Sequence, residues 1–298
     1  MQSTGFVRRE AEGIAYYSCT ALEEVTHLRH AFSTRHGGVS AMPAQSLNLG
    51  SVPWDTAAHV LENRRRFLSA LNLAPSSLAT VSQVHSAEFH IINSMAHQWN
   101  PRTPGDGLAT AQEGVALAVQ VADCFPVLLA DRQTGAIAAV HAGWRGTRAR
   151  ILSRTIAGMQ RGLGVNPAHL LAAIGPGIRS CCLEVGDEVA SAFDAEFSGA
   201  RLCSPSPHNA RKHFLDLPRA LHLQLAEAGV PQEAVSDLGL CTCCNPAEFF
   251  SYRAEGGHSG RMMAVICRTR TANRLKPLRT RLRGYRINRR AEALSHET

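Results

Sequence analysis

Apolar and polar positions alternate along the chain with two different periods, and the alternation predicts a mixed fold. Short apolar runs of strand length cover residues 81–92, 115–122, 126–130, 136–140, 170–174, 235–240 and 262–267. Between them, residues 56–71, 147–163 and 215–229 repeat apolar positions at helical spacing. A short hairpin turn at 131–135 argues against a purely parallel sheet. We therefore expect an α/β fold of the α+β type, with a layered mixed β-sheet flanked by helices in a single domain.

The positive charge of the chain is concentrated at its C-terminal end. The chain has 31 basic and 24 acidic residues, of which ten basic and two acidic residues fall within 268–298. Residues 1–267 are therefore nearly neutral. We predict one folded domain over residues 1–268 and a basic, disordered tail over residues 269–298. Such a tail can contact nucleic-acid phosphates with a steep salt dependence, whereas the domain has no aromatic-plus-basic stripe for a single strand.

Neither the hydropathy nor the cysteines indicate a membrane or secreted protein. No stretch approaches the roughly 18 uninterrupted apolar residues of a membrane-spanning helix, and the N-terminal residues have no apolar segment of a secretory signal. The chain has nine cysteines, and an odd number without a signal argues against a disulfide framework. We expect a cytoplasmic protein with free thiols and no membrane partner. The sequence leaves the oligomeric state open.

Residues 115–147 place polar side chains where strands are predicted to end. They read as strand, turn, strand, hairpin, strand and helix, so the first strand would deliver Asp123 and Cys124 to one edge of a sheet. The descending and ascending runs that follow have similar lengths, so His141 should return beside Cys124. His85 lies late in another predicted strand and can reach the same edge if that strand is a neighbour. The pattern predicts two imidazoles and one thiolate at one sheet edge.

This set of side chains has the chemistry of a metal site. Zinc prefers nitrogen and sulfur ligands in tetrahedral geometry, and three protein ligands leave the fourth position open, as in catalytic sites. Copper is the competing metal, because two histidines and one cysteine also suit it. Taken alone, however, Cys124 is typical of a buried thiol and His85 of a hydrogen-bonded histidine, and their spacing does not decide between these readings.

A series of short motifs favours the metal-site interpretation, because together they resemble a known family. They occur in the order FSTRHGGVS (32–40), SLNLG (46–50), QVHS (83–86), DGLAT (106–110), ADCFP (122–126), HAGWRG (141–146), IGPGIRSCCLEVGDEV (174–189), LDL (215–217) and FFSYR (249–253). Over roughly residues 25–267 the chain resembles the laccase-domain family, known as multicopper polyphenol oxidase-like proteins, purine nucleoside phosphorylases or peptidoglycan editing factors. The resemblance implies that His85, Cys124 and His141 ligate zinc.

The resemblance also implies an activity. It implies zinc-dependent phosphorolysis of purine nucleosides (adenosine, inosine, guanosine and methylthioadenosine), together with deamination of adenosine. The substrates would then be purine nucleosides and phosphate. Two alternatives remain open at this stage: a cysteine or zinc amidase that acts on peptidoglycan precursors, and a copper-dependent polyphenol oxidase.

Five further residues are candidates for the chemistry. Asp123, beside Cys124, is predicted to shuttle protons or to orient this ligand, the alternative being a strand-end cap. Arg35 and Arg145 lie in glycine-flanked segments and are predicted to bind phosphate, with Arg253 behind them, unless they are surface ion-pair partners. Cys182 is the candidate nucleophile of an amidase, or else a packed thiol.

Two features depart from the family pattern. Leu183 stands where the family commonly has an aromatic residue, so a ring that faces the substrate is predicted to be absent. Cys241, Cys243 and Cys244 form an unusually cysteine-rich run. We interpret them as core or surface thiols rather than a second metal site, because no matching C-x-x-C pair lies nearby in the sequence.

Overall fold

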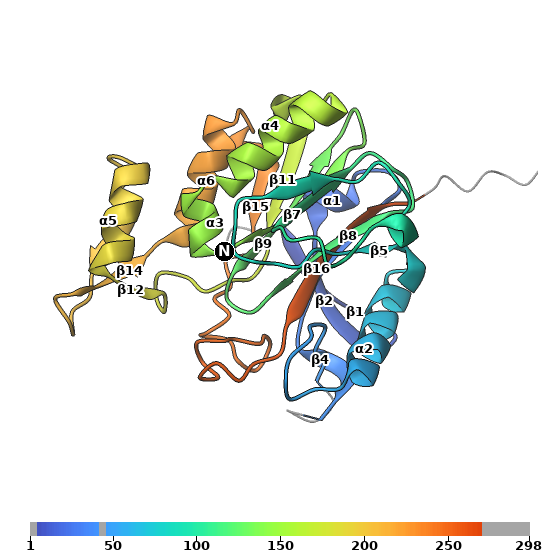
Figure 1. Ribbon diagram of the computed structural model, residues 1–298, viewed down its shortest axis with the longest axis horizontal. Helices are drawn as coiled ribbons and strands as arrows, with labels where there is room; N and C mark the ends of the chain where they lie inside the picture. Colours follow the sequence, from blue (N-terminus) through green and yellow to red (C-terminus); the bar gives the residue numbers. More distant parts are fainter. Residues whose placement is uncertain (1–4, 42–45, 270–298) are drawn as a thin grey trace, which may run out of the picture.

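The computed structural model describes residues 5–41 and 46–269, and its centre is a pair of packed β-sheets (Figure 1). The first sheet has the strand order β1 (Phe6–Ala11), β2 (Ile14–Cys19), β3 (Leu28–Ser33), β16 (Met262–Arg268), β8 (Ala116–Val121) and β5 (Leu78–Ala79). The second has the order β15 (Val235–Asp237), β11 (Leu170–Ile174), β9 (Phe125–Asp131), β10 (Ile137–Ala142), β7 (Gly107–Thr110) and β6 (Phe89–Ile91). Most neighbours are antiparallel, but β5, β6 and β15 each pair in parallel. The predicted mixed sheet architecture is confirmed.

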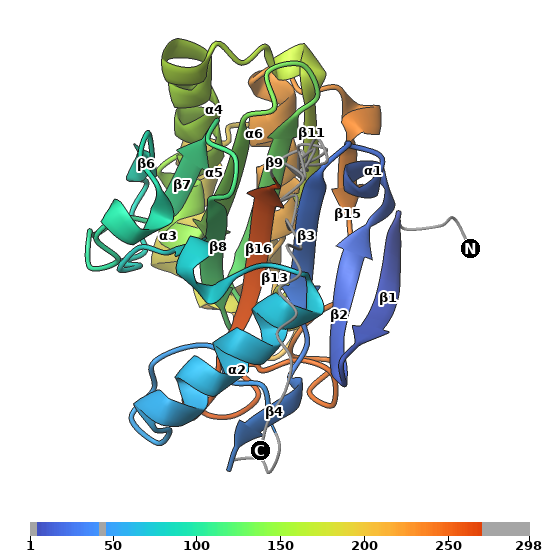
Figure 2. The ribbon, with the colours of Figure 1, turned by 90° about the vertical axis from the view of Figure 1, so that its right-hand side faces the viewer.

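Alternation along the strands divides the core into layers. In β8, Leu117 and Val119 face the second sheet and join the large core cluster, whereas Ala116 and Ala118 face the opposite side. That opposite side is covered by α2 (Ala57–Ala70), which crosses the first sheet in Figure 2 and buries Phe67 there. The central strands β8 and β16 are therefore buried on both faces, which explains their continuous apolar runs, whereas the edge strand β1 is largely exposed.

Helices cover the outer face of the second sheet, and a small third sheet extends to one side. The helices behind the second sheet are α3 (Trp144–Arg148), α4 (Ile151–Leu163) and α6 (Leu217–Glu227). The third sheet comprises β12 (Glu184–Gly186), β14 (Lys212–Leu215) and β13 (Cys203–Pro205), beside α5 (Asp187–Glu196) on the left of Figure 1. The remaining elements are α1 (Thr20–Glu23), β4 (His36–Ser40) and short 3₁₀ helices at Pro75–Ser77, Ala96–Gln98, Pro167–His169 and Gln232–Ala234.

The structure corrects two sequence predictions. Within 81–92 only Phe89–Ile91 is a strand, and His85 lies in a bend with a left-handed φ of 58°. The reason is a buried carboxylate, that of Asp106, which accepts hydrogen bonds from the backbone around His85 and folds it away from a sheet. The predicted helix over 147–163 is divided at Arg150, whose φ of 65° separates α3 from α4.

Two predictions lie partly outside the described residues. Residues 270–298 contain nearly all of the predicted basic tail, so the division at residue 268 stays a prediction. In residues 5–41 and 46–269, no helix combines the length and the apolarity that crossing a membrane requires.

Candidate metal centre and active site

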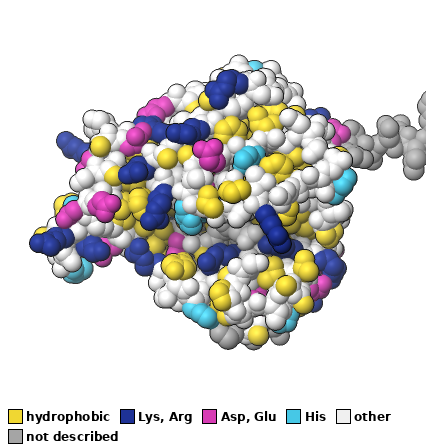
Figure 3. Space-filling view, viewed as in Figure 1, with side chains coloured by type: hydrophobic (Ala, Val, Ile, Leu, Met, Phe, Trp, Pro, Cys, Tyr) yellow, Lys and Arg dark blue, Asp and Glu magenta, His cyan; other side chains and the backbone are white. Residues whose placement is uncertain are grey.

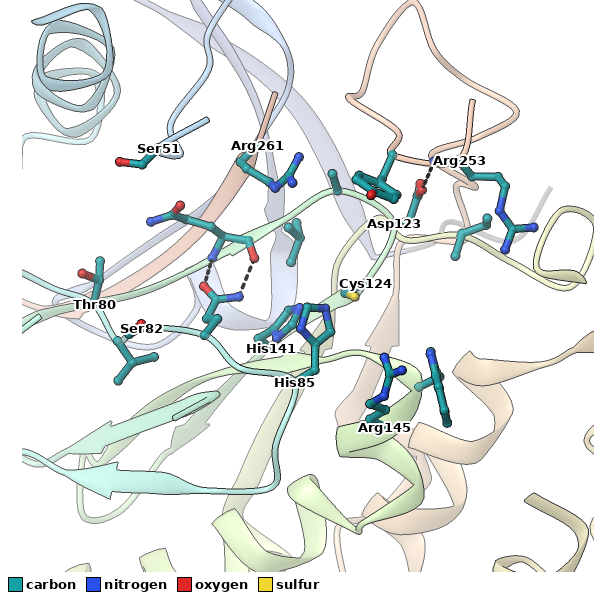
Figure 4. A pocket seen from close by; sticks show the side chains of 18 of the residues that line it. Ser51, Thr80, Ser82, His85, Asp123, Cys124, His141, Arg145, Arg253 and Arg261 are labelled. Atoms are coloured by element: carbon teal, nitrogen blue, oxygen red, sulfur yellow. Dashed lines mark hydrogen bonds between the residues drawn. The ribbon is translucent and has the colours of Figure 1, made fainter. Parts of the chain in front are cut away.

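Three side chains that are far apart in the sequence converge where the two sheets meet. The ligand atoms of His85, Cys124 and His141 all lie within 4.8 Å of one another, and the two imidazole rings are 4.9 Å apart (Figure 4). We call these residues the three-ligand site. His141 belongs to β10, Cys124 to the turn from β8 to β9, and His85 to the bend before β6. The sequence therefore predicted the convergence correctly, although His85 reaches it from a loop.

The hairpin of β9 and β10 brings His141 to Cys124. In its register His141 lies opposite Pro126, two residues after Cys124, as the similar lengths of the two runs predicted. Cys124 itself is not at the edge of a single sheet, because β8 belongs to the first sheet and β9 to the second. The turn that carries Cys124 thus links the two sheets, and the site lies where the chain passes between them.

Asp106 organises both histidines. Its carboxylate is fully buried and lies 2.7 Å from His141 Nδ1, which leaves Nε2 of that ring as the ligand atom. The same carboxylate accepts hydrogen bonds from the backbone N–H groups of Val84, His85 and Ser86. One buried acidic residue therefore orients one histidine by its ring and the other by its backbone.

The bend that carries His85 is also tied to the first sheet. Gln83 Nε2 donates to the carbonyl oxygen of Gln120 in β8, and the Gln120 N–H donates to Gln83 Oε1, both at 2.7 Å. This two-point contact (dashed in Figure 4) fixes the start of the bend without regular strand pairing. The left-handed backbone at His85 is a conformation that costs about 1–3 kcal/mol, so these contacts are needed to hold it.

Asp123 shapes the turn that precedes Cys124. Its backbone has a φ of 83°, which aspartate tolerates better than most residues. One carboxylate oxygen accepts a hydrogen bond from Thr242 Oγ1 at 2.6 Å and the other from the Arg253 N–H at 2.7 Å. Because both oxygens have protein donors and the residue is 8% exposed, this arrangement favours the predicted orienting role over proton shuttling.

Burial and charge act in opposite directions on the ligands. Burial alone would raise the pKa of the Cys124 thiol, but His141 and His85 outweigh this effect and lower the pKa to about 6. Burial alone would lower the pKa of His141, whereas the Cys124 thiolate and Asp106 raise it to about 9. The two histidines thus favour the thiolate of Cys124, which is the form of cysteine that binds a metal.

The surroundings fit a metal ion. A side-chain carbon added at Gly143 would lie 3.0 Å from Cys124 Sγ and 3.0 Å from His85 Cδ2, so only glycine leaves the ligand atoms this close to the backbone. His141 is buried, Cys124 is half-buried and His85 is exposed, so the site is closed behind and open in front. Three ligands with one open side are the arrangement of a catalytic rather than a structural zinc site.

The open side faces a cavity of about 910 Å³. A volume in this range accommodates a small organic ligand. Its wall includes the rings of Trp144 and Tyr252 and the guanidinium groups of Arg64, Arg102, Arg145, Arg253 and Arg261. Figure 4 shows Arg145 and Arg261 on different sides of the three-ligand site, and Figure 3 shows basic side chains around the middle of this face. The cavity thus combines a metal site, aromatic surface and positive charge.

The predicted arginines have different surroundings. Arg145 lies exposed on the wall, stacks its guanidinium 4.3 Å from the Trp144 ring, and makes no ion pair with any described residue. Arg253 also lines the cavity, but its guanidinium donates to the carbonyl oxygens of Cys182 and Glu184. Arg145 is therefore free to bind an anion, whereas Arg253 holds a loop.

Arg35 does not lie where phosphate binding requires it. It is not among the residues of the cavity wall; its guanidinium pairs with Glu255 at 2.9 Å and donates to the carbonyl oxygens of Pro246 and Phe249. It also stacks over Phe250. The geometry gives Arg35 the role of a clamp on the 246–255 loop and does not support the predicted contact with substrate.

Cys182 likewise lies outside the cavity wall. Its sulfur is 3.3 Å from the sulfur of Cys244, and burial, followed by hydrogen bonding to Cys244, raises the pKa of the Cys182 thiol above its usual range. A nucleophilic cysteine requires the opposite shift and a neighbouring base. The geometry therefore does not support the amidase nucleophile.

Two important residues were missed in the sequence. Asp106 was visible within the DGLAT motif, but only the fold reveals that it joins both histidines. Arg261, next to the buried strand β16, lines the cavity, and its Nη1 donates to the carbonyl oxygens of Ser259 and Gly260. Burial lowers the pKa of this guanidinium. A charged residue at the start of an apolar strand was the available signal for Arg261.

Comparisons with known proteins agree with this geometry. The sequence model of the family described as "Multi-copper polyphenol oxidoreductase laccase" matches residues 29–269. A Deinococcus radiodurans protein named purine nucleoside phosphorylase is 43% identical over 238 residues, covering 80% of this chain and 88% of the relative. Adenosine deaminase RL5, from an unknown prokaryotic organism, is 35% identical over 246 residues, covering 80% of this chain and 93% of the relative.

Solved structures show the same fold. The crystal structure of YlmD from Geobacillus stearothermophilus superposes with a TM-score of 0.78 and 33% identity, over 88% of this chain and 98% of that chain. The match of the family sequence model, the relatives and this superposition agree on one assignment. The chain belongs to the laccase-like family of multi-copper polyphenol oxidoreductase type, whose relatives include proteins named purine nucleoside phosphorylase and adenosine deaminase.

Proposed function

We propose that this protein is a zinc-dependent purine nucleoside phosphorylase that also deaminates adenosine. The observation that carries the proposal is the three-ligand site, open on one side toward a cavity with aromatic and cationic walls. The names of the relatives support the same two reactions. Adenosine, inosine, guanosine and methylthioadenosine are the proposed nucleosides, and phosphate is the second substrate.

The cavity offers a surface for each part of a nucleoside. Trp144 and Tyr252 present aromatic rings, and Tyr252 is 54% exposed although it lies on the wall. An exposed ring in a cavity is suited to stacking on a flat purine base. The polar side chains of Ser51, Thr80 and Ser82 on the wall can hydrogen-bond to ribose hydroxyls. Leu183 also lines the cavity but carries no ring, so Trp144 and Tyr252 are the residues that offer an aromatic surface to the base.

Phosphorolysis requires a phosphate held against the ribose C1′ carbon. One phosphate oxygen then forms a bond to C1′ while the bond from C1′ to the purine nitrogen breaks, and the base leaves. We assign phosphate binding to Arg145 and Arg261, because both lie on the cavity wall and a guanidinium can donate two hydrogen bonds to phosphate oxygens. Arg261 donates to carbonyl oxygens through Nη1 alone, whereas Arg253 uses both Nη1 and Nη2. Trp144 supports this role by fixing the guanidinium of Arg145 over its ring.

His85, Cys124 and His141 would hold the metal, and neighbouring carboxylates would orient these three ligands. Zinc held there would act as a Lewis acid and lower the pKa of a water molecule toward neutrality, as deamination at the purine C6 carbon requires. Asp106 would fix the ring of His141 and the backbone of His85, and Asp123 would hold the turn of Cys124. We propose Asp106 and Asp123 as positioning residues, since neither carboxylate has an oxygen without a protein donor.

The test is product chromatography on protein of known zinc content, incubated with adenosine in the presence and absence of phosphate. The proposal expects adenine only with phosphate, and inosine without phosphate; with phosphate, inosine should be accompanied by hypoxanthine, the base released from it. His85→Ala should lose both products, whereas His90→Ala, a histidine outside the cavity wall, should keep them. A zinc-loaded protein that yields neither product would contradict the proposal.

Copper chemistry is the second candidate, because the family description names copper and two histidines with one cysteine also suit that metal. It predicts oxygen consumption with a phenolic substrate by copper-loaded protein. Metal analysis of the purified protein, followed by this assay, separates it from the zinc proposal. A peptidoglycan amidase has less support, because Cys182 lies outside the cavity wall.

A further inference from the structure

A second group of metal-ligating side chains lies near the cavity but outside its wall. The sulfur atoms of Cys181, Cys182, Cys241 and Cys244 all lie within 4.8 Å of one another, and all four residues are free cysteines. Cys244 Sγ is 3.4 Å from Cys181 Sγ and 3.3 Å from Cys182 Sγ. We call these residues the four-cysteine cluster. None of them lines the cavity, so the nucleoside chemistry does not account for them.

The cluster joins two segments that are far apart in the sequence. Cys241 and Cys244 have the C-x-x-C spacing that is common among zinc ligands, and the adjacent Cys181 and Cys182 supply the other two sulfurs. The absence of a second pair nearby in the sequence argued against a metal site there. The fold removes that objection, because it places the loop after β11 against the loop after β15.

The geometry fits a tetrahedral ion. Zinc–sulfur bonds of about 2.3 Å correspond to sulfur–sulfur separations of roughly 3.8 Å around the ion. The sulfurs of the cluster already lie at 3.3 Å to at most 4.8 Å, so small side-chain movements suffice. In addition, the Arg179 N–H donates to Cys241 Sγ at 3.4 Å. Hydrogen bonds from the backbone to a ligand atom are typical supports of metal sites.

We propose that the four-cysteine cluster is a structural thiolate site for a soft divalent ion, with zinc as its natural occupant. Four sulfur ligands leave no open position, so the site would stabilise the fold without acting on substrate. Cys241 is buried, and Cys182 is half-buried. Cys181 and Cys244 are exposed, so the ion can enter from solvent.

The ion would fasten two loops that form the wall of the cavity. The first loop contributes Ile178 and Leu183 to the wall, and the second leads to Tyr252 and Arg253. The loops already share a hydrogen bond from the Thr242 N–H to the Gly177 carbonyl oxygen at 3.1 Å. Arg253 adds a hydrogen bond to the Cys182 carbonyl oxygen at 3.0 Å. A cross-link of four zinc–sulfur bonds would keep this part of the wall in place.

The test is zinc quantification on full-length protein purified under reducing conditions. The wild type should carry about two zinc ions per chain, one for each ligand group. Cys244→Ser and Cys181→Ser should each carry about one, and His85→Ala should also carry about one. Cys203→Ser, which removes a partly buried thiol outside the cluster, should keep about two.

Cobalt substitution in His85→Ala gives an independent readout that does not depend on activity. Cobalt bound by four thiolates should give strong sulfur-to-metal absorption, and this signal should be lost in His85→Ala with Cys244→Ser. The proposal would be overturned if His85→Ala carried no zinc. A disulfide between any two of the four cysteines that persists under the reducing conditions of purification would also overturn it. If His85→Ala retains about one zinc ion while the zinc-loaded wild type shows no nucleoside turnover, the result would support this site and contradict the proposed function.

Discussion

The three-ligand site and the four-cysteine cluster are neighbours, joined through the hydrogen bond from Thr242 to Asp123, yet they are built differently. Asp123 precedes a ligand of the first, and Thr242 follows a cysteine of the second. The first has mixed nitrogen and sulfur ligands, a buried carboxylate behind it and a cavity in front. The second has sulfur atoms alone, and its four residues lie outside the wall of that cavity.

This difference indicates a catalytic role for the three-ligand site and a structural role for the four-cysteine cluster. An open position beside a metal is useful only where substrate can reach it, and the cavity supplies that access at the three-ligand site. A closed set of four sulfurs can only hold chain segments together. Changes at the first site should therefore abolish turnover, whereas changes at the second should act through the shape of the wall.

The largest effect is expected from Cys124→Ala. Loss of the thiolate removes one of three ligands, and the Lewis-acid contribution of a metal is worth several kcal/mol, so both reactions should slow roughly a thousandfold. The check is the rate of adenine and inosine formation. Cys203→Ala is the control, because Cys203 lies outside both ligand groups. Turnover of Cys124→Ala within tenfold of wild type would contradict the catalytic role that distinguishes the three-ligand site from the four-cysteine cluster.

A smaller effect is expected from Asp106→Asn. The amide can keep some hydrogen bonds but loses the charge that orients His141, so zinc affinity at the three-ligand site should fall about 10- to 100-fold. The measurement is competition with a chelator. Asp131→Asn is a matched control, since Asp131 is also buried and binds backbone N–H groups away from the site. Equal zinc affinity in Asp106→Asn and wild type would show that Asp106 is not a positioning residue.

Arg145→Ala should separate the two reactions. Charge-assisted hydrogen bonds contribute about 1.5–3 kcal/mol, so the KM for phosphate should rise roughly 10- to 100-fold while deamination is unchanged. Steady-state kinetics with varied phosphate give this value. Arg148→Ala is the control on the same helix, because Arg148 is exposed and lies outside the cavity wall. A parallel loss of both reactions would assign Arg145 to the fold or the purine instead.

His30 lies outside the cavity wall and both ligand groups, so its replacement is expected to leave turnover unchanged at neutral pH. Burial lowers its pKa from 6.5 to about 4, and its Nε2 accepts a hydrogen bond from the Cys19 N–H. Below pH 6.5 the unfolded chain binds a proton that the folded chain accepts only near pH 4, so stability is lost as pH falls through this window. Each pKa unit corresponds to about 1.4 kcal/mol, so the free energy of unfolding should fall by on the order of 3 kcal/mol between pH 6.5 and 4.

Denaturant unfolding of wild type and His30→Gln between pH 7 and 4 measures this contribution. The glutamine keeps an acceptor for the Cys19 N–H and does not titrate, so its stability curve should be flatter over the same range. Identical slopes for the two proteins would exclude His30 as the source of the acid sensitivity.

Sequence periodicity predicted much of the fold but only part of the site. The hairpin of β9 and β10 was predictable because two apolar runs of similar length flank a turn, and it correctly brings His141 to Cys124. His85 was placed in a strand, since an apolar pattern does not reveal the buried carboxylate of Asp106 that bends the backbone there. Contacts between a side chain and distant backbone leave no periodic signal.

The same limit applies to the arginines and the cysteines. Arg35 lies in a glycine-rich segment like that of an anion site, but its guanidinium forms an ion pair with Glu255, which is far away in the sequence. Cys181 and Cys244 meet only through the packing of two loops, and loop conformation depends on tertiary contacts rather than on local pattern. Motif resemblance identified His85 as a ligand, but it did not reveal the contacts of Asp106 or Cys181, although both lie within quoted motifs.

The central claim is that the metal at the three-ligand site performs the nucleoside chemistry, and metal withdrawal and return test it most directly. Protein stripped by a chelator should form neither adenine nor inosine, and zinc should restore both in proportion to occupancy of that site, in wild type and in Cys244→Ser alike. Full turnover by the metal-free protein, or no recovery in a refolded and zinc-loaded protein, would contradict the account.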